Sequence, residues 1–256
     1  MFENGSSLCP QGEPVYSRPK AVEPLNPVNR GDSPVGMASA RPPLFSGIMP
    51  GDYTRISASA RVKEFTRGEM LYIEGDPVQQ VLLITSGFAK ITQLGMSGTE
   101  VILRFCGPGD VLGAVGICSN GTHGATAQAF RMCRALVWEA STFKALVERF
   151  PILHQNMVRI LGEDLLELQE RFREVATERV APRVARQLVR LLRTMGRQVN
   201  GMVEIGLSRE ELAQMTGTTL FTVSRLLSAW ESRGMVKPRR EAVTICDLPS
   251  LRAVSE

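Results

Sequence analysis

A chain of 256 residues with 43% hydrophobic and 22% charged residues has room for one large or two modest globular domains. No apolar run approaches the roughly 18–20 residues that span a bilayer, and the first residues lack a secretory signal, so we expect a cytoplasmic protein with no membrane partner. The net charge of +4 is uneven: 13 Lys and Arg and only 8 Asp and Glu lie from residue 177 onward, which favours an acidic partner such as nucleic acid.

Two regions of contrasting composition come first. Residues 1–45 hold 8 of the 15 prolines, and this composition predicts a disordered tail. Residues 46–150 contain short apolar stretches separated by glycine-rich turns, as at Gly87 and over 95–98 and 106–110. Strands at roughly ten-residue spacing are typical of a jelly roll or barrel, so we expect a β-roll here.

The cysteines form no recognisable site. Their number is odd, their positions are scattered, and no pair has Cys-x-x-Cys spacing, which argues against a disulfide framework and a zinc ribbon. We expect most of them to be small core residues. They are Cys9, Cys106, Cys118, Cys133 and Cys246. With two histidines and no phosphate-binding glycine loop or Gly-x-Ser-x-Gly turn, the sequence predicts neither an enzyme nor a metal site.

The hydrophobic period changes at residues 151–176. Apolar residues alternate at spacings of four and three, which predicts one long helix with a narrow apolar seam. The seam residues are Val158, Leu161, Leu165, Leu168 and Phe172. A helix that packs on its own barrel would also bury a stripe, but a narrow, continuous seam favours a parallel dimer.

Residues 177–250 predict a DNA-binding domain. A helix over Val180–Met195 precedes the stretch Leu207–Gly234, in which Ser208 and Glu211 have the spacing of a capping box. Gly217 falls in a tight turn, and a second helix follows over 219–232, capped by Thr218 or Thr219. This is the pattern of a helix-turn-helix, although two helices around a glycine turn also occur in proteins that never bind DNA.

The surface expected to contact DNA combines this helix pair with the hairpin that follows. A recognition helix contacts base edges with its N-terminal half. The candidates there are Ser208, Arg209, Thr218, Thr219, Leu220, Thr222, Ser224 and Arg225. Residues 235–246 read as a two-stranded wing whose Lys237, Arg239 and Arg240 either approach phosphates or form a solvated tip.

This α+β order of a β-roll, a long helix and a winged helix-turn-helix resembles the cAMP receptor protein/fumarate-nitrate regulator (Crp/Fnr) superfamily of bacterial transcription factors. The resemblance covers about residues 46–248 and rests most on 67–69, 75–77, Gly87, 109–113 and 207–234. It implies an effector-responsive homodimer that binds a palindromic site in double-stranded DNA and contacts RNA polymerase if it is an activator.

The expected effector pocket departs from the cyclic-nucleotide binders of this superfamily. They hold the ribose with a Glu after the glycine turn and the phosphate with an Arg-Ser pair. Here Ala114 follows Gly113, and the Arg-Ser positions fall on Gly124 and Ala125. The positions on the long helix that would contact the purine are Leu168 and Gln169. Because a buried anion without a charged partner is costly, we expect neither cAMP nor cGMP to bind.

The effector and any cofactor stay open from the sequence. The oxygen-sensing branch needs an N-terminal cysteine cluster, and residues 1–45 contain only Cys9. His123 and His154 are the histidines on which a haem-binding relative would depend. A haem- or redox-sensing regulator of the same fold is therefore one alternative, and a signalling module that does not bind DNA is another.

The recognition helix departs from the superfamily as well. The common pattern places Arg-Glu ahead of Thr-Val-x-Arg, and this chain has Leu220 and Phe221 in the place of that pair. Arg225 is retained and suits the O6 and N7 atoms of guanine. The two apolar side chains either pack on thymine methyl groups or, for Phe221, turn into the core. We therefore expect an operator unlike those of the better-known branches.

Overall fold

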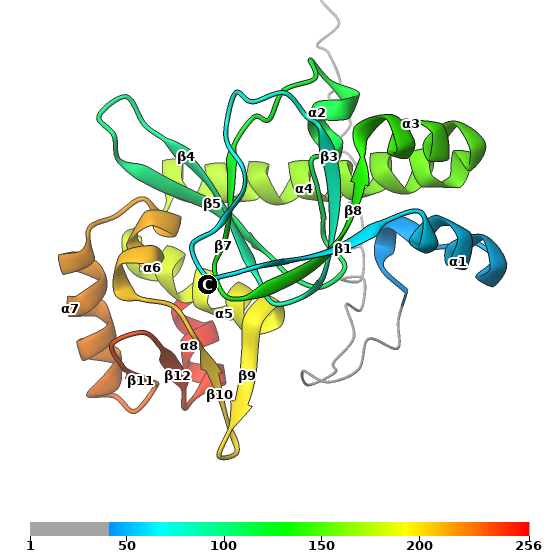
Figure 1. The fold of residues 1–256 in the computed structure, drawn as a ribbon. Helices are drawn as coiled ribbons and strands as arrows, with labels where there is room; N and C mark the ends of the chain where they lie inside the picture. Colours follow the sequence, from blue (N-terminus) through cyan, green and yellow to red (C-terminus); the bar gives the residue numbers. More distant parts are fainter. Residues whose placement is uncertain (1–40, 256) are drawn as a thin grey trace, which may run out of the picture. The chain divides into compact units, whose positions relative to one another are not determined.

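The computed structural model describes residues 41–255, which form a β-roll, a long helix and a C-terminal winged domain (Figure 1). Residues 1–40 of the predicted tail lie outside the described residues. The tail boundary predicted at residue 45 is wrong, because Pro43–Phe45 form a 3-10 helix, η1. Leu44 and Phe45 are fully buried there, in a cluster with Trp138 and Leu153.

Two four-stranded antiparallel sheets make the roll, which confirms the predicted fold class. In spatial order the first sheet contains β1 (Arg61–Phe65), β8 (Cys133–Glu139), β3 (Gln80–Ser86) and β6 (Val111–Leu112). The second contains β2 (Met70–Tyr72), β7 (Thr126–Ala129), β4 (Ala89–Leu94) and β5 (Glu100–Cys106). Strand residues alternate between the two faces of a sheet, so one set from each sheet, including Leu82, Ile84 and Ile91, fills the interior.

Three short helices accompany the roll: α1 (Pro50–Ala58), α2 (Ala114–Cys118) and α3 (Ala140–Arg149). Trp138 is fully buried beside α1 and α3. Its indole Nε1 donates a hydrogen bond to the carbonyl of Ile56 at 3.0 Å, which satisfies the one polar atom of this large side chain.

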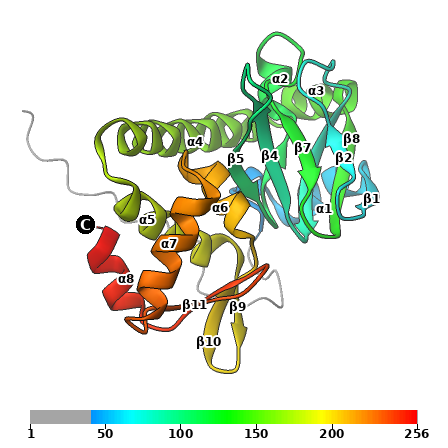
Figure 2. The same cartoon turned by 90° about the vertical axis from the view of Figure 1, so that its left-hand side faces the viewer.

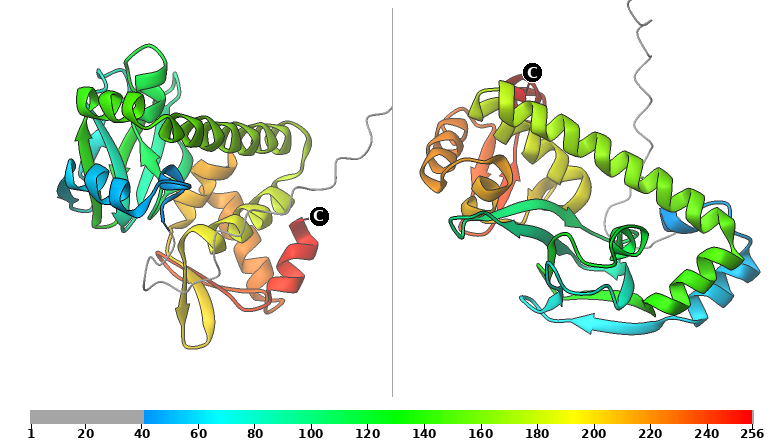
Figure 3. Two further views of the ribbon diagram at one scale, coloured as in Figure 1. Left: turned by 90° about the vertical axis from the view of Figure 1, so that its right-hand side faces the viewer. Right: turned by 90° about the horizontal axis from the view of Figure 1, so that it is seen from above.

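The long helix α4 spans Pro151–Thr177, one residue beyond the predicted end (Figure 3). Its first turns pack against η1, where the Asn156 side-chain amide donates to the carbonyls of Leu44 and Ser46, each at 2.8 Å. Among the described helices, α4 included, none is both long and apolar enough to cross a membrane.

The C-terminal domain contains one small sheet (Figure 2). Its buried residues form one apolar cluster, which also includes Ile102, Phe105 and Phe130 of the roll. Its helices are α5 (Val180–Met195), α6 (Arg209–Thr216), α7 (Leu220–Glu231) and α8 (Leu248–Ser255). Its sheet runs in the order β11 (Val236–Pro238), β12 (Val243–Ile245), β10 (Met202–Ile205) and β9 (Gly196–Val199). The sequence had not predicted the β9–β10 hairpin or α8. Because Leu251 of α8 is fully buried, the domain continues past its predicted end at residue 250.

Candidate nucleic-acid interface and effector pocket

Both helices of the helix-turn-helix begin where their own sequence caps them. The Ser208 hydroxyl accepts a hydrogen bond from the Glu211 backbone N–H at 3.1 Å, and the Glu211 carboxylate accepts one from the Ser208 N–H at 2.6 Å. Gly217 ends α6 with a φ of 59°, and Thr219 caps α7 by accepting from the Thr222 N–H at 3.2 Å. The predicted capping box is confirmed, and of the two candidate caps for α7 the structure uses Thr219.

Helix α7 divides sharply into a buried and an exposed face. Val223, Leu227 and Trp230 are buried in the core of the domain. Leu220 is 49% exposed and Phe221 is 76% exposed. The predicted alternative in which Phe221 turns into the core is therefore wrong, because α7 fills the core with its other face.

The predicted DNA-contacting residues of the helix pair occupy the start of α6, the turn and the first half of α7. Arg225 is exposed one turn after Phe221. The hydroxyls of Thr219 and Thr222 lie 3.0 Å apart and share a hydrogen bond. Arg209, at the first position of α6, is half-buried, and its Nε finds no hydrogen-bond partner within the described part of the chain. Arg209, Arg225 and the N-terminus of each helix contribute positive charge here, while Glu210 and Glu211 in the first turn of α6 offset the charge of the two arginines.

The predicted wing is confirmed as β11 and β12, and its basic residues differ in their surroundings. Lys237 and Arg240 are exposed. Arg239 lies 3.6 Å from the carboxylate of Glu204, which also pairs with Arg197 at 3.2 Å. Glu204 therefore offsets part of the charge of Arg239, while Lys237 and Arg240 stand out toward solvent.

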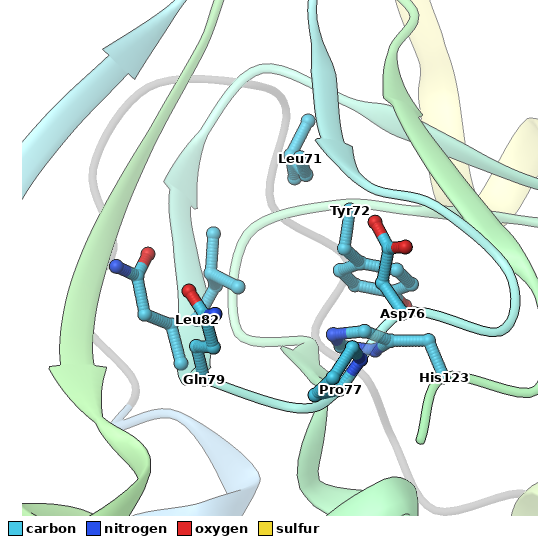
Figure 4. A pocket seen from close by; sticks show the side chains of 8 residues that line it. Leu71, Tyr72, Asp76, Pro77, Gln79, Leu82 and His123 are labelled. Atoms are coloured by element: carbon cyan, nitrogen blue, oxygen red, sulfur yellow. The ribbon is translucent and has the colours of Figure 1, made fainter.

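A pocket of about 370 Å³ opens in the roll between β2 and β3 (Figure 4). Its lining residues are Leu71, Tyr72, Asp76, Pro77, Gln79, Gln80, Leu82 and His123. The rings of Tyr72 and His123 stack with centroids 3.8 Å apart, and Leu82 and Gln79 lie across from them in Figure 4. Two backbone hydrogen bonds join the contributing loops: Gly75 N–H to the His123 carbonyl at 2.8 Å, and His123 N–H to the Asp76 carbonyl at 2.9 Å.

The charge of this pocket does not suit a phosphate. Its lining includes the Asp76 carboxylate and two carboxamides, but no lysine or arginine. Burial lowers the pKa of His123, and the negative charge of Asp76 opposes that shift without overcoming it, so the imidazole is neutral at pH 7. Burial also raises the pKa of Tyr72, which keeps its phenol protonated. A neutral or cationic ligand fits this lining better than an anion.

None of the residues predicted for the effector pocket is among its lining residues, although Gly113 lies next to Gln80 and Gly124 follows His123 in the chain. Gly113 precedes α2 and Ala114 begins it, behind the backbone of Gln80. The Gly124 carbonyl accepts from the Gln93 side chain at 2.7 Å, and Ala125 packs on the roll interior. Leu168 and Gln169 are exposed on α4. Instead His123, the residue just before Gly124, faces the pocket.

The sequence also gave no sign of the polar contacts on the inner face of α4. Arg104 of β5 pairs with Asp164 of α4 at 2.9 Å. Glu174 is 3% exposed and pairs with Arg186 at 3.1 Å and with Arg190. Burial raises the pKa of the Glu174 carboxyl, but the hydrogen bonds and charges of the two arginines lower it by more, so the carboxyl remains ionised.

The predicted seam occupies the other face of α4 and is exposed in the single chain. Val158, Leu165 and Leu168 are each more than half exposed, Phe172 is 75% exposed, and Leu161 is half-buried. The stripe that packs on the rest of the chain is a different one and includes Leu153 and Met157. The apolar seam is therefore not explained by the packing of α4 on its own roll.

The predicted core role fits two of the cysteines: Cys106 and Cys133 are buried, while Cys246 is exposed. Burial raises the pKa of the Cys133 thiol, which keeps it protonated and unreactive. Within residues 41–255, no three His, Cys, Asp or Glu side chains come together as a metal site would require.

Comparison with known proteins finds two domain families in this chain. The cyclic nucleotide-binding domain matches residues 62–150, and the Crp-like helix-turn-helix domain matches residues 182–254. The chain is 27% identical over 210 residues to the CRP-like cAMP-activated global transcriptional regulator of Mycobacterium tuberculosis, covering 81% of this chain and 94% of that protein. It is 28% identical to the cyclic AMP receptor protein of Thermus thermophilus, covering 76% and 88% of the two chains. The structure of FixK2 from Bradyrhizobium japonicum shares the fold, with a TM-score of 0.68 at 22% identity over 77% of this chain and 98% of that one.

Proposed function

Because the chain belongs to the Crp/Fnr family of transcriptional regulators, we propose that it binds a palindromic promoter site as a homodimer and responds to an effector other than a cyclic nucleotide. The family consists of DNA-binding regulators and not of enzymes. We place the protein in the cytoplasm, where it has access to DNA and, as an activator, to RNA polymerase.

The observation that carries the DNA-binding role is the exposed first half of α7, with Arg225 one turn after Phe221 on a helix capped by Thr219. A helix presented in this way enters the major groove with its N-terminal residues against base edges. Arg225 would read a guanine, and Lys237 and Arg240 on the wing would hold phosphates.

The exposed seam of α4 supports the homodimer. An isolated helix rarely leaves four large apolar side chains on one narrow stripe in water, and a second copy of α4 buries them by symmetry. A twofold dimer also places two copies of α7 on two half-sites about one helical turn apart, as a palindrome requires.

Charged seam residues test the dimer. Leu165→Lys with Leu168→Lys would put buried ammonium groups at the twofold seam, which costs several kcal/mol, so sedimentation should show a monomer. Leu166→Lys is the matched control, since Leu166 is 64% exposed on the same helix but lies off the seam. A double variant that stays dimeric would mean that the seam is misassigned.

Two features of the roll support an effector other than cAMP or cGMP. Gly124 and Ala125 provide no charged clamp, and the pocket beside them contains the Asp76 carboxylate, which repels a phosphate. Titration calorimetry with either nucleotide should detect no binding at physiological concentrations. A micromolar dissociation constant for one of them would contradict this part of the proposal.

The decisive experiment is selection of bound sequences from a random DNA pool with the full-length protein, with and without a metabolite extract. We expect one palindromic sequence to be enriched, with an affinity that falls steeply as salt rises. If no sequence is enriched under either condition, the chain is a signalling module that does not read DNA.

A further inference from the structure

Two neighbouring apolar side chains stand exposed on the first turn of the recognition helix. Leu220 and Phe221 are 49% and 76% exposed, whereas Val223, Leu227 and Trp230 of the same helix are buried. Phe221 makes no ring or cation contact in the described structure. Burial of the Phe221 side chain in the core would stabilise the fold. Its exposure therefore indicates a surface that a binding partner covers.

The surroundings of this pair offer little hydrogen bonding. The Thr219 hydroxyl accepts from the Thr222 N–H at 3.2 Å and shares a further hydrogen bond with the Thr222 hydroxyl at 3.0 Å. The cap thus holds the first turn of α7 in place and uses the nearest polar groups within the helix. Leu220 and Phe221 thus form an apolar patch, with half-buried Ser224 and exposed Arg225 about one turn away.

The spacing of Phe221 and Arg225 sets the distance between their targets. Residues four apart lie on the same face of a helix, about 6 Å apart along its axis. Successive base pairs of DNA rise by about 3.4 Å. A base that Phe221 contacts therefore lies within about two base pairs of the guanine that Arg225 reads.

We propose that Phe221, flanked by Leu220, reads the C5-methyl group of a thymine within two base pairs of the guanine bound by Arg225. This inference rests on the proposed DNA-binding function. Among the four bases, thymine alone carries a methyl group in the major groove, and an apolar side chain recognises it by contact without a hydrogen bond. The chain thus selects a thymine through hydrophobic burial, next to a guanine selected through hydrogen bonds.

Replacement of thymine by deoxyuridine removes this methyl group and leaves base pairing unchanged. In the selected operator, each thymine near the guanine is replaced in turn, symmetrically in both half-sites. For the unmodified protein, replacement at one of these positions should weaken binding by about fourfold per half-site, or about fifteenfold for the two half-sites together. This is the loss expected for one buried methyl group. The other thymines should change the affinity little.

The variants then assign that effect to its side chain. Phe221→Ala should bind the thymine operator at least fourfold more weakly per half-site and should no longer distinguish thymine from deoxyuridine. Ser228→Ala, at an exposed position two turns later on α7, is the matched control and should keep the full discrimination. Since Phe221 is largely exposed, thermal unfolding of both variants should match the parent chain.

The outcomes separate this inference from the function on which it rests. An enriched operator that binds equally well with thymine and deoxyuridine at every position overturns methyl reading and leaves DNA binding intact. A Phe221→Ala variant that keeps the discrimination assigns the methyl contact to another residue and also overturns the inference. Failure to enrich any operator refutes the proposed function itself.

Discussion

The surface of α7 and the pocket of the roll are built in opposite ways. The candidate base-reading residues, from Thr219 to Arg225, come from one continuous segment and are mostly exposed. The pocket gathers its lining from β2, the following loop, β3 and the loop before β7. Hydrogen bonds between Gly75, Asp76 and His123 hold those segments together.

Because of this difference, function and stability depend on different residues of α7, whereas in the pocket of the roll they depend on the same residues. An exposed side chain on α7 makes few contacts within the fold, so its replacement should alter DNA binding and leave the free energy of unfolding almost unchanged. The pocket residues also hold strands and loops together. Substitutions there should therefore change stability along with any ligand binding.

Two glycines with left-handed backbones test this contrast most directly. Gly113 has a φ of 85°, and an added Cβ would meet the backbone oxygen of Gln80 at 2.6 Å. Gly217 has a φ of 59° with open space around it. Gly113→Ala should lower the free energy of unfolding by about 3 kcal/mol, and Gly217→Ala by about 1 kcal/mol.

Urea unfolding of the two variants measures this difference. The substitution is the same and φ is positive at both sites, with ψ at −16° for Gly113 and 46° for Gly217, so the larger part of the difference reports the contact of the added Cβ with Gln80. If both variants lost the same free energy of unfolding, the roll would accommodate an added methyl group at Gly113 as easily as the open turn before α7 does at Gly217.

The same contrast explains what the sequence predicted and what it did not. The caps at Ser208 and Thr219 and the tight turn at Gly217 are relations between residues a few positions apart. Such local patterns placed both helices correctly. The orientation of Phe221 was left open because a phenylalanine is more often buried than exposed, and the structure shows it on the face of α7 opposite Val223 and Leu227.

The pocket depends on relations that no local pattern encodes. Tyr72 and His123 stack although about 50 residues separate them, and the superfamily comparison pointed one residue further on, to Gly124. Arg104 and Asp164 meet only once β5 and α4 are in place. Leu44 and Phe45 lie in a proline-rich stretch, and their burial shows only when η1 packs against α4.

The recognition helix allows a test in which binding changes and stability does not. Arg225→Ala should cost about 1–3 kcal/mol per half-site and relax the preference at one base pair, because a bidentate contact to guanine is lost. Lys237→Ala should weaken all sequences alike and reduce the salt slope by roughly one unit, as expected for a lost phosphate contact. Both residues are exposed, so unfolding should be unaffected.

Titrations on the selected operator and on scrambled DNA over a salt series distinguish the two roles. Arg239 is the weaker choice for the wing variant, because Glu204 already pairs with it. Equal losses on both DNAs for Arg225→Ala would make Arg225 a phosphate contact. Base reading would then fall to Thr219, Thr222 or Ser224.

The smallest expected effect concerns pH, and it should arise in the roll and not on α7. Burial lowers the pKa of His123 below its ordinary value of 6.5, so the folded protein holds this proton less tightly than the unfolded chain does. The stabilising contribution of neutral His123 is complete above about pH 6.5 and is lost as the pH falls through the lower, folded-state pKa. His123→Phe keeps a ring beside Tyr72 but does not titrate, so its free energy of unfolding should fall less than that of the parent chain from pH 7.5 to 5.

Asp76→Asn should have the opposite effect, because the Asp76 carboxylate favours protonated His123 and its removal makes protonation of the folded state harder. Urea unfolding over this pH range measures all three proteins, and parallel curves for the parent chain and His123→Phe would show that His123 is not held neutral by the pocket.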